Sequence, residues 1–118
     1  MKKILIAEDN DSNFILMTYI LKKYYQFERA KNGQEAVEMA EKNTYDIVLM
    51  DIKMPIMDGL EATKAIKEKF PNLPIIALTA NAFDEDVQRS MQAGLNAHLS
   101  KPVEPDALFD TLETLIKP

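Results

Sequence analysis

The chain has 118 residues, of which 47% are hydrophobic and 28% are charged, and its formal net charge is −5. This size and composition are typical of a single globular domain, here residues 1–118, that buries roughly two-thirds of its unfolded surface. The sequence has no cysteine and no run of five basic residues, which excludes disulfides and thiolate centres and argues against direct binding of nucleic acid.

The first predicted element is a strand. Within Lys3–Ala7, the run Ile4–Ala7 is continuously apolar, as a strand buried on both faces of a parallel sheet is. Its apolar part is too short for a signal sequence or a membrane span, and two acidic residues follow it. We therefore expect a soluble, cytoplasmic protein that does not insert into a membrane.

Helix-like and strand-like segments alternate along the rest of the chain. The predicted strands are Lys3–Ala7, Gln26–Ala30, Asp46–Met50, Pro74–Leu78 and Ala97–Ser100. The predicted helices are Asn13–Tyr24, a segment ending near Lys42, Leu60–Phe70, Asp84–Met91 and a last one that begins at Pro105. Strict alternation with short connections predicts an α/β fold: one doubly wound, five-stranded parallel sheet with five helices.

Apolar residues at spacings of three and four predict which helix faces are buried. The face predicted for the first helix consists of Phe14, Met17, Leu21 and Tyr24. The face predicted for the last helix consists of Leu108, Phe109, Leu112, Leu115 and Ile116. Asp84–Met91 has few apolar residues, so we expect it to be among the less stable elements.

Four of the predicted strands end at chemically reactive side chains. These residues are Glu8 and Asp9 after the first strand, Asp51 after the third, Thr79 after the fourth and Lys101 after the fifth. In a parallel sheet the carboxyl ends of the strands share one edge, where ligands bind. Two carboxylates about 4 Å apart repel by roughly 4 kcal/mol, and one lysine does not balance three acids. The sequence therefore predicts a divalent cation, and oxygen-only ligands favour Mg²⁺.

The same residues suit phosphoryl transfer. Asp51 would be the nucleophile and would form an acyl phosphate, while Lys101 pairs with the phosphoryl group and the Thr79 hydroxyl donates to another oxygen. Each residue alone has a simpler explanation, such as an exposed turn and helix cap at Glu8–Asn10. Their joint occurrence at four strand ends favours the chemical interpretation.

Five segments resemble the motifs of the receiver domain of two-component response regulators, and together they extend over essentially the whole chain. They are Ile4–Asn10, Asp46–Asp51, Met54–Gly59, Leu78–Ala80 and Ser100–Pro102. The resemblance implies the flavodoxin-like receiver fold, with strand order 2-1-3-4-5. It also implies that Asp51 is phosphorylated by a histidine kinase or a histidine phosphotransfer protein. Such a domain is a phosphoryl acceptor that promotes its own phosphorylation and dephosphorylation, rather than a conventional enzyme.

The resemblance also assigns roles to individual residues. Asp9, Asp51 and the backbone carbonyl of Lys53 would hold Mg²⁺, with Glu8 contributing directly or through water. Lys53 and Asn81 flank the crevice and are expected to tune the lifetime of the phosphate by controlling access of water. The Lys101–Pro102 peptide bond can be cis, a state that proline makes accessible.

Two segments, Thr79–Ala82 and Ala93–Val103, resemble receivers of hybrid histidine kinases and phosphorelays. A free-standing regulator and a receiver from a longer protein both remain open. The family usually has Tyr or Phe three residues before the lysine, where this chain has His98. His98 is either a switch residue that titrates near neutrality or a strand residue with no role in switching. The expected signalling face consists of the helix Asp84–Met91, the strand that carries His98 and the last helix.

Three other functions fit the sequence less well. A phosphohydrolase of the haloacid-dehalogenase type would need a second aspartate two residues after Asp51, and Lys53 occupies that position. A flavodoxin-like electron carrier would need a phosphate loop rich in Ser, Thr or Gly after the first strand, where Glu8–Asp11 would repel a phosphate. A pseudo-receiver acting only as a binding scaffold would not need the complete set of site residues.

Overall fold

The computed structural model describes residues 2–80 and 92–116. Its strands form one parallel sheet in the order β2-β1-β3-β4-β5, as predicted. The strands are β1 (Lys3–Ala7), β2 (Gln26–Ala30), β3 (Ile47–Asp51), β4 (Ile75–Thr79) and β5 (Ala97–Ser100). The more polar Gln26–Ala30 lies at one edge of the sheet, and the most apolar runs occupy its centre.

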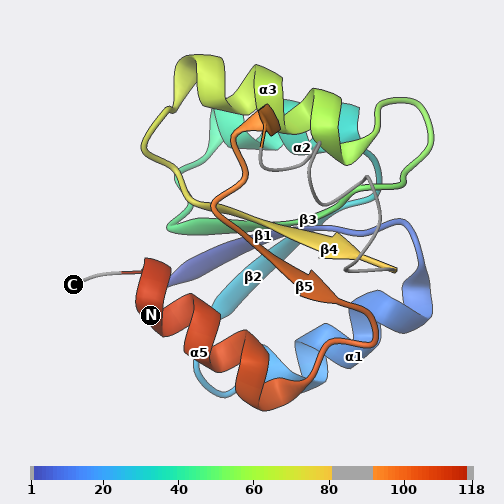
Figure 1. Cartoon of the computed structure of the whole chain (residues 1–118), viewed down its shortest axis with the longest axis vertical. Helices are drawn as coiled ribbons and strands as arrows, with labels where there is room; N and C mark the ends of the chain where they lie inside the picture. Colours follow the sequence, from blue (N-terminus) through green and yellow to red (C-terminus); the bar gives the residue numbers. More distant parts are fainter. Residues whose placement is uncertain (1, 81–91, 117–118) are drawn as a thin grey trace.

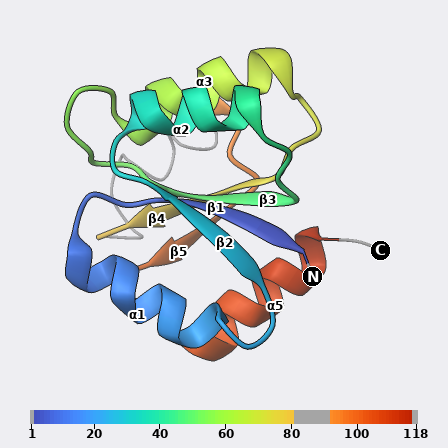
Figure 2. The ribbon, with the colours of Figure 1, turned by 180° about the vertical axis from the view of Figure 1, so that it is seen from behind.

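Helices cover both faces of the sheet (Figures 1 and 2). On one face lie α2 (Gly33–Lys42) and α3 (Gly59–Lys69), and on the other lie α1 (Asp11–Leu21) and α5 (Pro105–Leu115). These four are the helices of the described ranges; the fifth predicted helix, Asp84–Met91, lies outside them. None of the four is long and apolar enough to cross a membrane.

Two apolar layers result, because successive side chains of a strand point to opposite faces of the sheet. In β3, Val48 and Met50 pack toward α2 and α3, whereas Ile47 and Leu49 pack toward α1 and α5. All four side chains are fully buried, which explains why the run is continuously apolar rather than alternating. The predicted apolar face of α5 is confirmed, since its residues belong to the second layer.

Several predicted boundaries differ from the structure by one to three residues. Strands β3 and β4 each begin and end one residue later than predicted, and α3 begins and ends one residue earlier. Asp51 and Thr79 belong to their strands because they still pair with Leu78 and Ser100 of the neighbouring strands. Helix α1 begins at Asp11. Asn10 caps it, because the Asn10 side chain accepts a hydrogen bond from the backbone N–H of residue 13.

Tyr24 was predicted to lie on the apolar face of α1, and this prediction is wrong. The helix ends at Leu21, and the backbone N–H of Tyr24 donates to the Leu21 carbonyl in the turn toward β2. The Tyr24 side chain is 63% exposed and contacts the Phe109 ring edge to face, with the centroids 5.5 Å apart.

Two glycines allow the segment between β3 and α3 to lie close to its neighbours. The Gly59 N–H donates to the Ile52 carbonyl at 2.8 Å, and a Cβ atom at Gly59 would lie 2.2 Å from the Asp51 carbonyl oxygen. The Gly33 N–H donates to the Met57 carbonyl at 2.9 Å, and a Cβ there would lie 2.2 Å from that oxygen. A larger residue at either position would displace the segment that follows β3.

Candidate functional site

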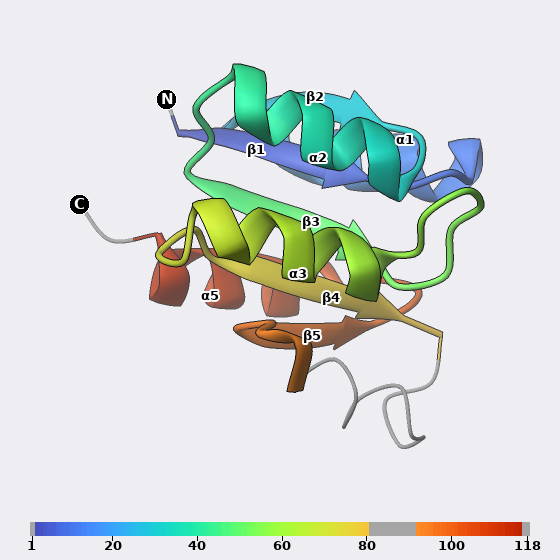
Figure 3. The same cartoon turned by 90° about the horizontal axis from the view of Figure 1, so that it is seen from above.

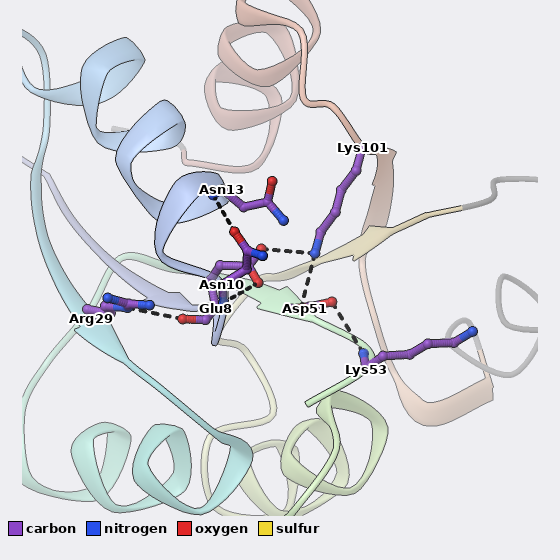
Figure 4. A network of polar contacts seen from close by, with 7 residues as sticks. All are labelled: Glu8, Asn10, Asn13, Arg29, Asp51, Lys53 and Lys101. Atoms are coloured by element: carbon purple, nitrogen blue, oxygen red, sulfur yellow. Dashed lines mark hydrogen bonds and ion pairs between the residues drawn. The ribbon is translucent and has the colours of Figure 1, made fainter. Parts of the chain in front are cut away.

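The reactive side chains predicted at four strand ends come together at one edge of the sheet. Glu8, Asp51, Thr79 and Lys101 line a pocket of about 250 Å³. Its other polar lining residues are Asp9, Asn10, Asn13 and Lys53. Figure 4 shows most of these side chains gathered between the turn after β1, the end of β3 and the residue after β5.

Lys101 joins the two buried carboxylates of the pocket. Its Nζ lies 2.9 Å from Glu8 Oε1 and 3.1 Å from Asp51 Oδ2. Burial alone would lower the pKa of Lys101, but the hydrogen bonds and charges of Glu8 and Asp51 outweigh burial and raise that pKa. Lys101 therefore stays positively charged, which is the state needed to bind an anion. The predicted cis Lys101–Pro102 bond is present.

The pKa of Asp51 lies well above the usual value for an aspartate. Burial, followed by a hydrogen bond with Glu8 and the Glu8 charge, raises the pKa of Asp51 from 3.8 to about 7, although Lys101 acts in the opposite direction. The backbone N–H of Lys53 donates to Asp51 Oδ1 at 3.3 Å. Lys101 alone is thus not enough to keep the pKa of Asp51 at its ordinary value. Added positive charge would stabilise the ionised Asp51 carboxylate.

The acidic residues form a candidate metal site. Glu8, Asp9 and Asp51 each offer one carboxylate oxygen, and these atoms all lie within 4.8 Å of one another. Glu8 and Asp51 are buried while Asp9 is exposed, so the group is reachable from solvent on one side. An all-oxygen set of this kind fits a hard cation such as Mg²⁺. The predicted role of the Lys53 carbonyl stays a prediction.

Thr79 presents a hydroxyl that has no partner among the described residues. The residue is 4% exposed, lines the pocket, and its Oγ1 is buried without a hydrogen bond. A buried hydroxyl without a partner is uncommon and needs an explanation. Donation to an oxygen atom of a ligand in the pocket would supply the missing hydrogen bond.

The role of Arg29 is visible only in the folded structure. Its Nε donates to the Glu8 backbone carbonyl at 3.0 Å, its Nη2 lies 2.8 Å from Asp11 Oδ1, and its guanidinium stacks 4.5 Å from the centre of the Phe14 ring. Arg29 thus fixes the turn between β1 and α1 that carries the first two acids. The only indication in the sequence is indirect, because Arg29 lies near the end of the strand that pairs with β1, in register with Ile6.

The structure gives less information on the remaining residues that were predicted to have a role. His98 is an exposed residue of β5, in register with Ala77, while its neighbours Ala97 and Leu99 pack toward α1 and α5. Whether it takes part in switching stays a prediction. Asn81 and the helix Asp84–Met91 lie outside the described residues, so only part of the expected signalling face is described.

Residues 4–113 match the sequence model of the response regulator receiver domain. The chain belongs to this family. Receiver domains are the phosphoryl acceptors of two-component signalling. This receiver domain is 37% identical, over 98% of its length, to hybrid signal transduction histidine kinase I of Dictyostelium discoideum. It spans 7% of the length of that kinase.

Solved receiver structures agree with the fold of this receiver domain. One is the receiver domain of sensor histidine kinase PA1611 from Pseudomonas aeruginosa, which has a magnesium ion in its active-site cleft. The two are 38% identical with a TM-score of 0.92, over 98% of this chain and 97% of that one. Another is the receiver domain of Saccharomyces cerevisiae Ssk1, solved with the histidine phosphotransfer protein Ypd1 (30% identity, TM-score 0.91, covering 98% and 88%).

Proposed function

We propose that residues 1–118 act as one receiver domain that accepts a phosphoryl group on Asp51, in a Mg²⁺-dependent reaction, and signals through a changed surface. The donor is a histidine kinase or a histidine phosphotransfer protein, and the downstream partner is a protein rather than a nucleic acid. One observation carries the proposal. Asp51 lies at the end of β3 with the Glu8 and Asp9 carboxylate oxygens within 4.8 Å, and the Lys101 ammonium contacts both Asp51 and Glu8.

The reaction needs an ionised nucleophile in line with the leaving group. A carboxylate oxygen of Asp51 attacks the phosphorus of the donor phosphohistidine, so that a P–O bond forms and the P–N bond breaks. The electron pair of the broken bond stays on the imidazole nitrogen, which takes up a proton. Lys101 Nζ, 3.1 Å from Asp51 Oδ2, pairs with a phosphoryl oxygen, and the Thr79 hydroxyl donates to another.

The acidic residues have a separate task. Glu8, Asp9, Asp51 and the Lys53 carbonyl would hold Mg²⁺, which supplies positive charge for the phosphoryl oxygens. Without that charge, a dianionic phosphoryl group would meet three carboxylates in a pocket where two of them are buried. The likeness to the magnesium-containing PA1611 receiver supports this assignment.

The signal ends when water hydrolyses the acyl phosphate, a reaction that this receiver is proposed to promote on itself. Lys53 is exposed and lines the pocket beside Asp51, where its side chain can limit the approach of water. We propose the same tuning role for Asn81. The likeness to the Dictyostelium kinase supports a receiver of the hybrid-kinase and phosphorelay type, acting in the cytoplasm either as a free-standing regulator or as part of a longer protein.

The decisive experiment is phosphorylation by a small-molecule donor. Incubation with acetyl phosphate and Mg²⁺, followed by intact-mass measurement, should give one phosphoryl adduct that hydroxylamine removes. Asp51→Asn should abolish the adduct, as should EDTA, whereas Asp110→Asn, which removes an exposed acid of α5, should leave it unchanged. Absence of the adduct with acetyl phosphate and with phosphoramidate would replace the proposal by the binding-scaffold alternative.

A further inference from the structure

The segment between β3 and α3 holds a strained apolar residue. Ile56 has a φ of 71° and is the one non-glycine residue of the described ranges with positive φ. The N–H of Met57 donates to the Pro55 carbonyl at 2.8 Å, which closes a three-residue turn around Ile56. This is the rarer and more strained form of the γ-turn, and for a β-branched residue such a φ is a real outlier.

The surroundings of Ile56 impose this conformation. On one side Gly33 donates to the Met57 carbonyl at 2.9 Å, and on the other Gly59 donates to the Ile52 carbonyl at 2.8 Å. The close approaches at both glycines leave the segment little room to relax. The fold requires the turn, but it does not require isoleucine in it, because glycine, asparagine or aspartate adopts positive φ with less strain.

The Ile56 side chain does not contribute to the core either. It is 83% exposed, more than any other large apolar residue in the described part of the chain. An exposed isoleucine in a strained backbone conformation adds nothing to the stability of the isolated domain. A contact with another molecule would give this side chain a role.

The position of Ile56 indicates which molecule that is. Ile52 and Lys53 line the Asp51 pocket, and Lys53, Pro55 and Asp58 line an adjoining hollow of about 450 Å³ that also reaches Asp9. Figures 1 and 3 show this loop at the same edge of the sheet as the turn from β1 into α1. Ile56 itself lines neither space, but it lies between Pro55 and Asp58 in the loop that borders them.

We propose that Ile56 is a docking residue for the protein phosphodonor, a histidine phosphotransfer protein, and inserts into an apolar surface beside the donor histidine. The inference rests on the function proposed above. A donor imidazole carried by a protein must bring the surrounding protein surface onto the rim of the pocket, whereas a small phosphodonor enters without touching the rim. The Ssk1 receiver, 30% identical to this chain, was solved with such a protein, Ypd1.

During transfer Ile56 takes no part in the chemistry. The P–N bond of the donor breaks and the P–O bond to Asp51 forms as described above, with the proton taken up by the donor imidazole. Ile56 affects only how often and how long the donor is held in position. Its loss should therefore be visible with a protein donor and invisible with a small one.

The test compares two donors, Ypd1 phosphorylated on its histidine and acetyl phosphate, with Ile56→Asn as the main variant. Asparagine tolerates positive φ, so the variant should fold and melt a few degrees higher than the wild type. Transfer from phospho-Ypd1 should fall roughly tenfold or more, as expected for loss of a buried isoleucine contact. Labelling by acetyl phosphate should be unchanged.

Two further variants serve as matched controls. Ile56→Val keeps a β-branched apolar side chain and should transfer within roughly fourfold of the wild type, as loss of one methylene predicts. Tyr24→Asn removes another exposed apolar residue, which is 63% exposed and does not line the phosphoacceptor pocket, and should change neither reaction.

Several outcomes would overturn the inference. They are unchanged transfer from phospho-Ypd1 to Ile56→Asn, equal loss of labelling with both donors in that variant, and no transfer from phospho-Ypd1 to the wild type while acetyl phosphate labels Asp51. If neither donor labels the wild type, the proposed function fails instead, so the two failures are distinguishable.

Discussion

At the scale of single residues, Asp51 links the stability of the fold to pH. Its pKa is raised from 3.8 to about 7 by burial and by Glu8, so between these pH values the folded protein binds more protons than the unfolded chain. The folding contribution of this group is therefore most favourable below about pH 4, weakens as pH rises, and becomes constant above about pH 7.

Asp51→Asn should remove this dependence. In EDTA at pH 8 we expect the variant to be more stable than the wild type by on the order of 3 kcal/mol, because it no longer places an ionised carboxylate beside Glu8. At pH 5 the difference should shrink, since the wild-type carboxyl is then largely protonated. Urea unfolding at the two pH values measures both quantities, and equal stabilities at pH 8 would contradict the raised pKa.

Lys101 is the opposite case, a charge whose removal should destabilise the fold. Lys101→Met leaves Glu8 and Asp51 without the ammonium that lies about 3 Å from each. We expect a loss of roughly 3 kcal/mol in EDTA at pH 8, the usual cost of breaking a buried ion pair on one side. Urea unfolding measures the loss.

The control for Lys101 is Lys69→Met. Lys69 lies 3.1 Å from Glu41, but its side chain is 59% exposed, so its loss should change stability by about 1 kcal/mol or less. Adding Asp51→Asn to Lys101→Met should restore part of the lost stability, because one of the two unpaired carboxylates is then gone. If both lysine variants lose the same amount, the buried ion pair has no special role.

At the scale of elements, the junction of β3 and α3 determines the position of Asp51. A Cβ at Gly59 would lie 2.2 Å from the Asp51 carbonyl oxygen and 2.9 Å from the Ile52 Cα, both backbone atoms. Gly59→Ala should therefore push α3 away from the end of β3, with a loss of about 3 kcal/mol and slower labelling by acetyl phosphate. Lys64→Ala, at an exposed site of the same helix, should leave both unchanged.

The same junction shows what the sequence could and could not predict. Strand ends and apolar faces follow from local patterns, so the meeting of Glu8, Asp51, Thr79 and Lys101 at one edge was predictable. The strained φ of Ile56 was not, because it depends on Gly33, which lies 23 residues earlier in the chain and contacts Met57 only in the folded protein.

Other features that the sequence did not predict correctly have similar physical causes. Strands β3 and β4 run one residue beyond their apolar segments because pairing with the neighbouring strand, rather than hydrophobicity, sets the end. Tyr24 continues the helical spacing of α1, but the chain turns after Leu21 to reach the edge strand. Arg29 acts through contacts with Glu8 and Asp11, which no spacing in the sequence reveals.

At the scale of the whole molecule, the pocket is connected to the edge of the sheet that carries His98. Thr79 pairs with Ser100, and the Lys101 N–H donates to the Thr79 carbonyl at 2.7 Å. A phosphoryl group that binds both the Thr79 hydroxyl and the Lys101 ammonium therefore acts on β4 and β5 together. Signalling through β5 and α5 stays a prediction, and it is consistent with this connection.

The pocket should also couple cation binding to global stability. The proposed Mg²⁺ site exists only in the folded protein, where Glu8, Asp9 and Asp51 lie within reach of one ion, so binding of the cation should raise the melting temperature. At tenfold the dissociation constant the gain is about 1.4 kcal/mol, which for a chain of this size is a shift of several degrees. A thermal-shift titration measures it.

The pH dependence of this shift is the sharper part of the prediction. Mg²⁺ requires the ionised carboxylate, and the pKa of Asp51 is about 7 in the metal-free protein, so the shift should be larger at pH 8 than at pH 6. Asp51→Asn should weaken it at both, whereas Glu113→Gln, which removes an exposed acid of α5, should not. A shift independent of pH, or one that survives in Asp51→Asn, would mean that the cation stabilises the protein from another place.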